Sequence, residues 1–320
     1  MTTTSPSATH EKTIGLLVGR ERSFPDALIA EIARRGAGVV ASYAQLDITR
    51  IDQPPAYDVL VDRISHDVPC YQPMLKLAAL AGSRVVNNPF WRIADDKAFG
   101  TALAQRLGVP VPKTAVLPQK SYGPDLIAAS LANLRYPLDW AGLERDFGYP
   151  MYLKPHWGGG FKDVYKVKDR EDLFRVFDRT GTLVMIAQES IEWAQYVRCV
   201  VVGQTEVLAL PWDPTLQHFD RYRLASTTMP PLAPELQTTI EAHARTLCRA
   251  LGYDMNTVEF AVRDGVPYAI DFMNSAPDFD ISSLGQQSFD WVVEKMSDLL
   301  VRLAHEPKKT RMRWDELLGA

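Results

Sequence analysis

The sequence predicts an α/β protein in which a parallel unit comes first and a region of antiparallel strand pairs follows. Over about the first ninety residues, short apolar runs alternate with helical patterns, which is typical of parallel strands joined by crossover helices. After residue 150, apolar runs follow one another across short Gly-containing turns, which indicates hairpins and an α+β organisation. The length of 320 residues allows two or three such units.

The composition is that of an ordinary globular chain, and it excludes several classes of partner. Hydrophobic residues make up 46% of the chain and charged residues 23%. The formal charge is −4 and no basic tract is long enough to hold nucleic acid, so we expect no nucleic-acid partner. No apolar run reaches the ~20 residues that span a bilayer, so we expect no membrane partner.

The three cysteines are Cys70, Cys199 and Cys248, and they lie far apart in the sequence. Their odd number and their spacing fit neither a disulfide framework nor a CxxC metal site. We therefore expect reduced, mostly buried thiols in a cytoplasmic protein.

The elements of the first unit follow from apolar runs and the Gly and Pro residues between them. Residues 1–12 are polar and rich in Ser and Thr, which predicts a disordered tail without the apolar stretch of a signal peptide. The predicted elements are a strand at 13–19, a helix at 24–35, strands at 39–43 and 57–63, a helix at 73–81 and a short strand at 85–86.

A helix opens the second region, because Asp95 or Asp96 can cap its first turn and Gly108 with Pro110 ends it. Residues 120–149 are polar and irregular, and we expect an insertion of unassigned role with a helix near 125–134. The other predicted elements are strands at 150–155, 164–167 and 182–190, hairpins of 197–202 with 207–211 and of 255–262 with 266–272, and helices at 170–178, 234–251 and 289–305.

The segment LKPHWGGGFKD has the composition of a phosphate-binding loop. Lys154 ends a predicted strand, and three glycines at 158–160 let backbone N–H groups approach phosphate oxygens. A lysine beside such a loop supplies a point charge for the phosphates. A tight hairpin with an exposed lysine explains this segment equally well when it is taken alone.

The segment VEFAVRDGVPYAIDFMNSAP places acids on two paired strands. Glu259 lies on the first strand, and Asp271 and Asn274 lie at the end of the second. Oxygen ligands of this kind hold Mg²⁺, which also coordinates substrate phosphates. The alternative is a solvated Glu259 and a turn-capping Asp271, but apolar neighbours on both strands make unpaired charges costly.

Taken in order, these segments resemble the ATP-grasp superfamily, in particular the RimK-like and glutathione-synthetase-like ligases. The resemblance extends from Ile14 to about Ala304. It implies a pre-ATP-grasp α/β domain at 13–94, a two-lobed ATP-grasp domain at 95–308 with its small lobe at about 112–190, and a C-terminal tail at 309–320.

The resemblance also implies roles for individual residues, carried by DDKAFGTALAQRLGVPVPKT, YLKPHWGGGFKDVYKV, QESIEWAQYVRCVVVG, VEF and IDFMN. The implied contacts to ATP are Lys97, Lys154, Gly158, Gly159, Gly160, Lys162, Gln188, Glu189, Ile191 and Gln195. The implied ligands of Mg²⁺ or Mn²⁺ are Glu259, Asp271 and Asn274, and the implied catalytic residues are Arg198 and Lys154.

The sequence departs from the family pattern in four places. Two residues rather than one separate Asp271 from Asn274, so either a bulge absorbs the extra residue or Asn274 does not bind metal. No acid stands at the usual ribose position, where Gln195 or Glu192 would substitute. Tyr196 replaces the Asp that usually comes two residues before the arginine. The glycine-rich loop carries the bulky Trp157 and Lys162, and Lys162 either reaches the γ-phosphate or is solvated.

By resemblance, the expected function is an ATP- and Mg-dependent ligation of a carboxylate, of an amino acid or peptide, to an amine through an acyl phosphate. The alternatives are an ATP-grasp kinase acting on a small-molecule hydroxyl and a nucleotide-binding protein without chemistry. The substrates are expected to be a small-molecule carboxylate and amine, and a homodimer is possible. We expect acceptor recognition in PWDPTLQHFDRYRLAS, where Arg221, Arg223 and Asp213 are the candidates and a charged surface loop is the alternative.

Overall fold

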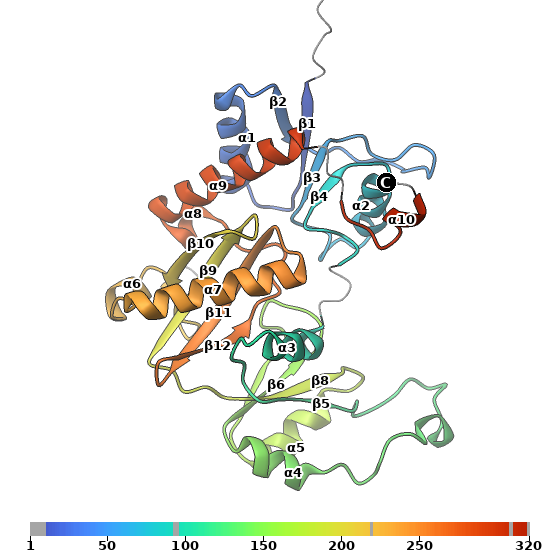
Figure 1. Cartoon of the computed structure of the whole chain (residues 1–320). Helices are drawn as coiled ribbons and strands as arrows, with labels where there is room; N and C mark the ends of the chain where they lie inside the picture. Colours follow the sequence, from blue (N-terminus) through green and yellow to red (C-terminus); the bar gives the residue numbers. More distant parts are fainter. Residues whose placement is uncertain (1–10, 92–95, 218–219, 307–309, 319–320) are drawn as a thin grey trace, which may run out of the picture.

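The computed structural model describes residues 11–91, 96–217, 220–306 and 310–318. In this part of the chain, three four-stranded sheets succeed one another along the length of the molecule (Figure 1). The N-terminal sheet and the C-terminal sheet share a core, and the sheet from the middle of the sequence lies beyond them. Residues 1–10 of the expected tail and Asp95, one of the two expected helix caps, lie outside the described residues.

The first sheet is the expected parallel unit. Its strands are β1 (Lys12–Leu17), β2 (Val39–Tyr43), β3 (Val59–Asp62) and β4 (Arg84–Val86), in the order β2-β1-β3-β4. All three pairings are parallel. The crossover helices are α1 (Ser23–Arg35) and α2 (Tyr71–Leu80). Strand β1 includes Lys12, which the sequence analysis assigns to the tail and which pairs with Asp58 at 2.8 Å.

The second sheet contains β5 (Thr114–Leu117), β6 (Met151–Pro155), β7 (Tyr165–Val167) and β8 (Met185–Glu189). Its order is β5-β8-β6-β7 and all its pairings are antiparallel. Helices α4 (Trp140–Phe147) and α5 (Arg170–Arg179) accompany it. The ring of Trp140 meets Phe174 and Phe177 edge to face, which joins the two helices.

The third sheet contains β9 (Gln195–Val202), β10 (Glu206–Pro211), β11 (Met255–Arg263) and β12 (Val266–Asp271). Its order is β10-β9-β11-β12, and all its pairings are antiparallel. Side chains alternate between its faces, so Cys199 and Val201 pack with α7 (Pro234–Leu251), while Val200 and Val202 pack with α9 (Gln286–His305).

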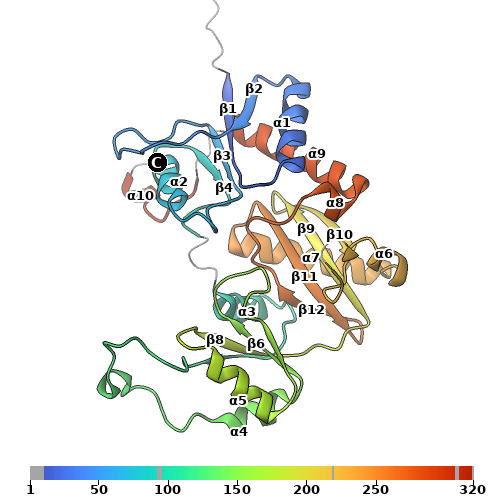
Figure 2. The same cartoon turned by 180° about the vertical axis from the view of Figure 1, so that it is seen from behind.

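Helix α9 joins the first and third sheets, because its apolar residues share one core with β1 and β9. Figure 2 shows α9 between these sheets from behind. Three further helices are α3 (Lys97–Arg106), α6 (Ala225–Thr228) and α8 (Ile281–Leu284). Gly100 lets α3 lie against the end of β12, since a Cβ there would meet Met273 Sδ at 2.9 Å.

The expected helix near 125–134 is wrong. Only a 3₁₀ turn forms at Ala128–Leu131, and none of its residues is buried. The helical pattern fails because most of residues 118–139 extend away from the second sheet, and short helices depend on packing (Figure 1). Helix α4 was not predicted from the sequence, and Asp139 caps it by accepting a hydrogen bond from the Gly142 N–H at 2.9 Å.

The residues from 310 to 318, assigned to a tail from the sequence, pack against the first sheet. Thr310 is buried, and its hydroxyl oxygen accepts from the Val85 N–H and donates to the Ser83 carbonyl, both at 2.8 Å. Trp314 contacts Phe90 edge to face just before α10 (Asp315–Leu318). The C-terminal segment therefore packs beside β4, the edge strand of the first sheet.

The structure also bears on two expectations from the sequence, the burial of the cysteines and the lack of a membrane-spanning segment. Cys199 and Cys248 are buried free thiols and Cys70 is free and exposed, in agreement with the expectation of mostly buried thiols. Among the helices that the structure describes, none combines the length and the apolar character needed to cross a bilayer.

Candidate active site

The hairpin of β11 and β12 brings the two predicted metal-binding acids together. Glu259 pairs directly with Asp271 across the strands, and the register then shifts so that Phe260 pairs with Ala269. Ile270 is therefore the extra residue of a β-bulge, left without a strand partner. The bulge lies before Asp271 rather than between Asp271 and Asn274, and it places the two acids opposite each other.

Lys154 reaches this hairpin from the second sheet. It lies on β6, its side chain is buried, and its Nζ donates to the carbonyl of Ile270 at 3.3 Å. The bulge leaves that carbonyl available. Burial lowers the pKa of Lys154 and the charge of Lys97 adds to this effect, while Asp271 and Glu259 oppose it. One lysine thus joins the sheets that would form the two lobes.

Lys97 contacts the glycine-rich loop that follows Lys154, and its charge acts on Lys154. Asp96 caps α3 by accepting from the Ala98 and Phe99 N–H groups, which fixes Lys97 as the first helical residue. The Lys97 Nζ donates to the Gly158 carbonyl at 2.5 Å.

The loop itself needs its glycines. Gly158 has a φ of 110° and Gly160 a φ of 70°, a region that L side chains rarely adopt. A Cβ at Gly158, Gly159 or Gly160 would meet nothing within 4 Å, so the backbone here is open to a ligand. Lys162 is exposed in the same loop.

Glu259 lies among groups of both charges. Its Oε2 accepts from the Tyr196 hydroxyl at 3.1 Å, and its Oε1 lies 3.6 Å from Arg198 Nε. Burial raises the pKa of Glu259 to about 7, with a contribution from Asp271, against the opposing effects of Arg198, Tyr196 and Lys154. A buried carboxyl of this kind is at its most favourable when a cation neutralises it.

The raised pKa predicts a pH-dependent stability for the metal-free protein. An acid whose folded pKa is near 7 and whose unfolded pKa is 4.5 contributes its full stability below pH 4.5 and loses it as the pH rises through 7. Relative to Glu259→Gln, the unfolding free energy of the wild type should therefore fall between pH 4.5 and 7, by on the order of 3 kcal/mol. Urea unfolding in EDTA measures it, and parallel curves for the two proteins would contradict the shift.

Thr257 connects the arginine to the end of β12. Its hydroxyl oxygen accepts from Arg198 Nη2 at 3.1 Å and from Asn274 Nδ2 at 3.0 Å. The Asn274 amide nitrogen is thus engaged, which leaves its Oδ1 as a candidate ligand. In the described ranges no cluster of three or more His, Cys, Asp or Glu side chains occurs. Two carboxylates and one amide oxygen fit Mg²⁺, which usually takes one or two carboxylates and completes its shell with phosphates and water.

The predicted acceptor residues have three different environments. The Arg221 guanidinium lies 5.0 Å from the Phe161 ring centre and 5.3 Å from that of Trp212, and its Nε donates to the Leu216 carbonyl. It therefore links the glycine-rich loop to the segment after β10. Arg223 is exposed and pairs with Asp220.

Asp213 serves its own turn. Its Oδ1 accepts from the Thr215 N–H at 2.8 Å and from the Thr215 hydroxyl at 2.6 Å. These bonds form an Asx turn, so the Asp213 side chain has a structural role here. Arg221, in contrast, contacts Phe161 of the glycine-rich loop.

The predicted hinge residues connect the second and third sheets. Gln188 is buried and donates to the Thr114 hydroxyl at 3.1 Å, and Ile191 is buried. The Glu189 carboxylate forms an ion pair with Arg263 at 2.9 Å, and this pair links β8 of the second sheet to β11 of the third. Gln195 donates to the Pro230 carbonyl at 3.0 Å, which engages the side chain expected at the ribose.

Sequence reasoning missed three contributors to the site. Thr257 lies two residues before Glu259 on one strand, so the period of two was a signal that both share a face. Trp212 and Tyr222 lie in the segment expected to recognise the acceptor, but no sequence signal placed them beside Arg198, because only folding brings them there. Burial raises the pKa of Tyr222 to about 12, so the hydroxyl stays protonated.

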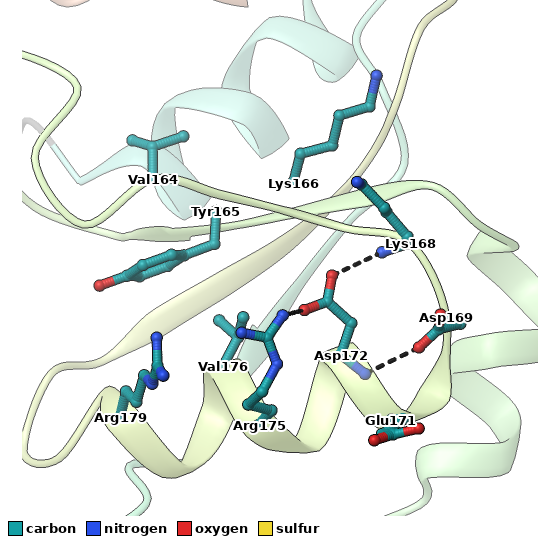
Figure 3. A pocket seen from close by; sticks show the side chains of 10 residues that line it. All are labelled: Val164, Tyr165, Lys166, Lys168, Asp169, Glu171, Asp172, Arg175, Val176 and Arg179. Atoms are coloured by element: carbon teal, nitrogen blue, oxygen red, sulfur yellow. Dashed lines mark hydrogen bonds and ion pairs between the residues drawn. The ribbon is translucent and has the colours of Figure 1, made fainter.

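An open hollow of about 540 Å³ lies elsewhere, between β7 and α5 (Figure 3). Asp172 pairs there with Arg175 and accepts a hydrogen bond from the backbone N–H of Lys168. None of the predicted nucleotide or metal ligands lines it.

The chain is similar to known proteins in sequence over part of its length and in structure over most of it. No family model matches the sequence. The chain is 29% identical over 167 residues to D-alanine–D-alanine ligase B of Chromobacterium violaceum. That match covers 48% of this chain and 46% of the relative, so it spans about half the length of the curated protein.

Solved structures are similar over nearly the whole chain. The ATP complex of D-alanine–D-alanine ligase from Bacillus anthracis has a TM-score of 0.61 at 16% identity, covering 92% of this chain and 96% of that one. A RimK domain ATP-grasp protein from Sphaerobacter thermophilus has a TM-score of 0.60 at 22% identity, covering 90% and 99%.

Proposed function

We propose that this chain, which has the ATP-grasp fold of those solved structures, is an ATP-dependent carboxylate–amine ligase. The observation that carries the proposal is the meeting of Lys154, from the second sheet, with the hairpin that holds Glu259 and Asp271. Cations on one side and hard oxygen ligands on the other form an arrangement suited to a metal-bound triphosphate.

In this proposal the two lysines and the loop bind the phosphates. Lys97 and Lys154 balance phosphate charge, and the N–H groups of the glycine-rich loop donate to phosphate oxygens. Lys97 exchanges its present bond to the Gly158 carbonyl for a phosphate oxygen. Gln188, Glu189 and Ile191 line the purine, with Glu189 contributing backbone atoms because its carboxylate binds Arg263.

Glu259, Asp271 and Asn274 would hold Mg²⁺ or Mn²⁺, which when bound neutralises the β- and γ-phosphates and polarises the γ-phosphorus. The protein's own part is to fix Glu259 and Asp271 on one hairpin and Asn274 just after it. Arg198 is 9% exposed, and its Nε makes no hydrogen bond in the described part of the chain. The guanidinium lies beside Glu259, with Nε 3.6 Å from Oε1, and there its charge would act on an oxygen of the transferred phosphoryl group.

The reaction would proceed in two displacements. A substrate carboxylate oxygen bonds to the γ-phosphorus, the bond to the β,γ-bridging oxygen breaks, and ADP leaves. The amine nitrogen then bonds to the acyl carbon, phosphate leaves with the bonding electrons, and the nitrogen loses a proton to give the amide. Arg198 faces the oxygens that carry negative charge in both steps, which is where a fixed cation lowers the barrier most.

The names of the similar ligases support an amino acid as one substrate. Arg221 supplies a guanidinium held between two aromatic rings, a geometry that suits carboxylate recognition. Kinase activity on a hydroxyl is the alternative, and polyphosphate substrates would favour a denser basic cluster than this chain, with its net charge of −4, provides.

An ADP-release assay tests the proposal. The protein is incubated with ATP, Mg²⁺ and pooled amino acids and amines, and products are identified by mass. ADP release that requires both a carboxylate and an amine, with a product lighter by one water than their sum, is expected. A product heavier by one phosphate would establish the kinase instead, and no ADP release with any pool would contradict both.

Arg221 and Arg223 form a matched pair for locating the acceptor. Arg221→Ala should raise the KM of the amine substrate by about 10- to 100-fold, because a charge-assisted contact of ~1.5–3 kcal/mol is lost. Arg223→Ala should leave that KM unchanged, since Arg223 is exposed and pairs with Asp220 three residues before it. Steady-state kinetics measures both, and equal effects in the two variants would remove Arg221 from the acceptor site.

The domain boundaries, the cytoplasmic location and the homodimer stay predictions. Size-exclusion chromatography with light scattering measures the mass in solution. A mass near twice that of the 35.9 kDa chain is expected for the homodimer.

A further inference from the structure

Tyr196 touches the proposed metal site, although sequence reasoning noted it only as a departure from the family pattern. It lies two residues before Arg198 on β9, so both side chains project from the same face of the sheet. Its hydroxyl donates to Glu259 Oε2 at 3.1 Å, while Arg198 lies 3.6 Å from Oε1. Each oxygen of the Glu259 carboxylate thus has its own neighbour.

The Tyr196 ring has little freedom to move. Its centre lies 5.6 Å from that of Trp193, nearly edge to face, and 5.5 Å from that of Trp212. The backbone N–H of Trp212 donates to the Tyr196 carbonyl at 3.0 Å, which holds the residue just after β10 against Tyr196. Tyr196 is only 5% exposed. Packing therefore fixes the position of the hydroxyl before any ligand binds.

We propose that Tyr196 is a positioning residue that holds the Glu259 carboxylate in the orientation needed to bind the divalent cation of the nucleotide complex. The inference rests on the proposed function, since it assumes that Glu259 is a metal ligand. A carboxylate oxygen has two lone pairs, so Oε2 can accept from Tyr196 and still face a cation. Hydrogen bonds to ligating carboxylates set ligand orientation and affect metal affinity.

The Tyr196 hydroxyl is a neutral donor beside two acids, Glu259 and Asp271. A further carboxylate here would add negative charge beside Glu259 and Asp271 in a buried site, which is costly without a metal. The phenol instead donates a neutral hydrogen bond to the existing carboxylate. The site then keeps fewer acids but holds Glu259 more firmly.

Metal binding measured without turnover tests this role. Mn²⁺ is titrated into the protein saturated with a non-hydrolysable ATP analogue, and free Mn²⁺ is followed by electron paramagnetic resonance. Tyr196→Phe, which keeps the ring between the two tryptophans, should raise the Kd of Mn²⁺ by about 10-fold. Tyr253→Phe removes a buried hydroxyl from the core on the α7 side of the same sheet, and it should leave that Kd unchanged.

The outcomes separate this inference from the proposed function. A wild type that binds no Mn²⁺ with the nucleotide analogue overturns the proposed site itself. A wild type that binds Mn²⁺ while Tyr196→Phe binds it equally well overturns only the role of Tyr196. Tyr196→Phe could also weaken binding of the analogue in the absence of metal, or lower the free energy of unfolding by as much as it lowers the free energy of Mn²⁺ binding. Either result would make Tyr196 a structural residue, and the inference would be wrong.

Discussion

Replacing Glu259 by glutamine is expected to reduce ATP-dependent turnover by about 10²- to 10³-fold. Glutamine keeps the shape of the side chain and can still accept the hydrogen bond from Tyr196. What it loses is the charge that holds a divalent cation beside Asp271, its cross-strand partner. The ADP-release assay measures the rate, and the Mn²⁺ titration shows whether metal binding is lost in parallel.

The fold should survive this change. Burial already raises the pKa of Glu259 to about 7, so removing its charge relieves a desolvation cost in the metal-free protein. Tm should therefore not fall. Glu206→Gln is the matched control, because Glu206 lies exposed on β10 of the same sheet, and it should retain wild-type turnover. Near-normal turnover in Glu259→Gln would remove Glu259 from the site.

Replacing Lys154 by methionine should have an effect of similar size, again about 10²- to 10³-fold on turnover. Methionine fills the same volume in the buried space beside β12 but carries no charge and donates no hydrogen bond to Ile270. We expect the KM of ATP to rise and kcat to fall together, because the ammonium would contact phosphates in both the bound and the transition state.

Lys166→Met is the control for Lys154. Lys166 lies on the neighbouring strand β7, where its exposed ammonium sits 5.8 Å from the Tyr152 ring centre. Its removal should leave both kinetic constants within about twofold, since exposed contacts of this kind contribute little. Circular dichroism should show the same fold for both variants, with Tm values within about 5 °C. Unchanged kinetics in Lys154→Met would be incompatible with a phosphate-binding lysine.

Part of the fold was readable from the sequence because the signals are local. Helix α7 occupies the predicted residues, Pro234–Leu251, since a proline at its start and Gly252 at its end, with φ of 71°, fix both ends. The Asp264-Gly265 turn predicted the β11–β12 hairpin for a similar reason, because both residues adopt positive φ there. Apolar runs supplied the strands, because burial and a period of two leave their mark directly on the sequence.

Sequence reasoning failed where neighbours distant in the chain decide the outcome. The pattern at 125–134 is helical, but no packed surface covers it, and propensity alone does not hold a short helix. The segment from 310 to 318 looks like a tail, but Thr310 satisfies two backbone groups at the edge of the first sheet. Arg223 and Asp213 look like substrate ligands, but local partners engage both.

The sequence by itself determined which chemical groups are present and on which strands they lie, because short-range periodicity and turn residues encode that information. Only the tertiary structure decided which groups meet. It set Glu259 opposite Asp271 by a bulge at Ile270 and brought Lys154 to the carbonyl that the bulge leaves unpaired. It also placed the Tyr196 hydroxyl on Glu259 between two tryptophans. Such contacts depend on register and on packing between sheets, which no local pattern specifies.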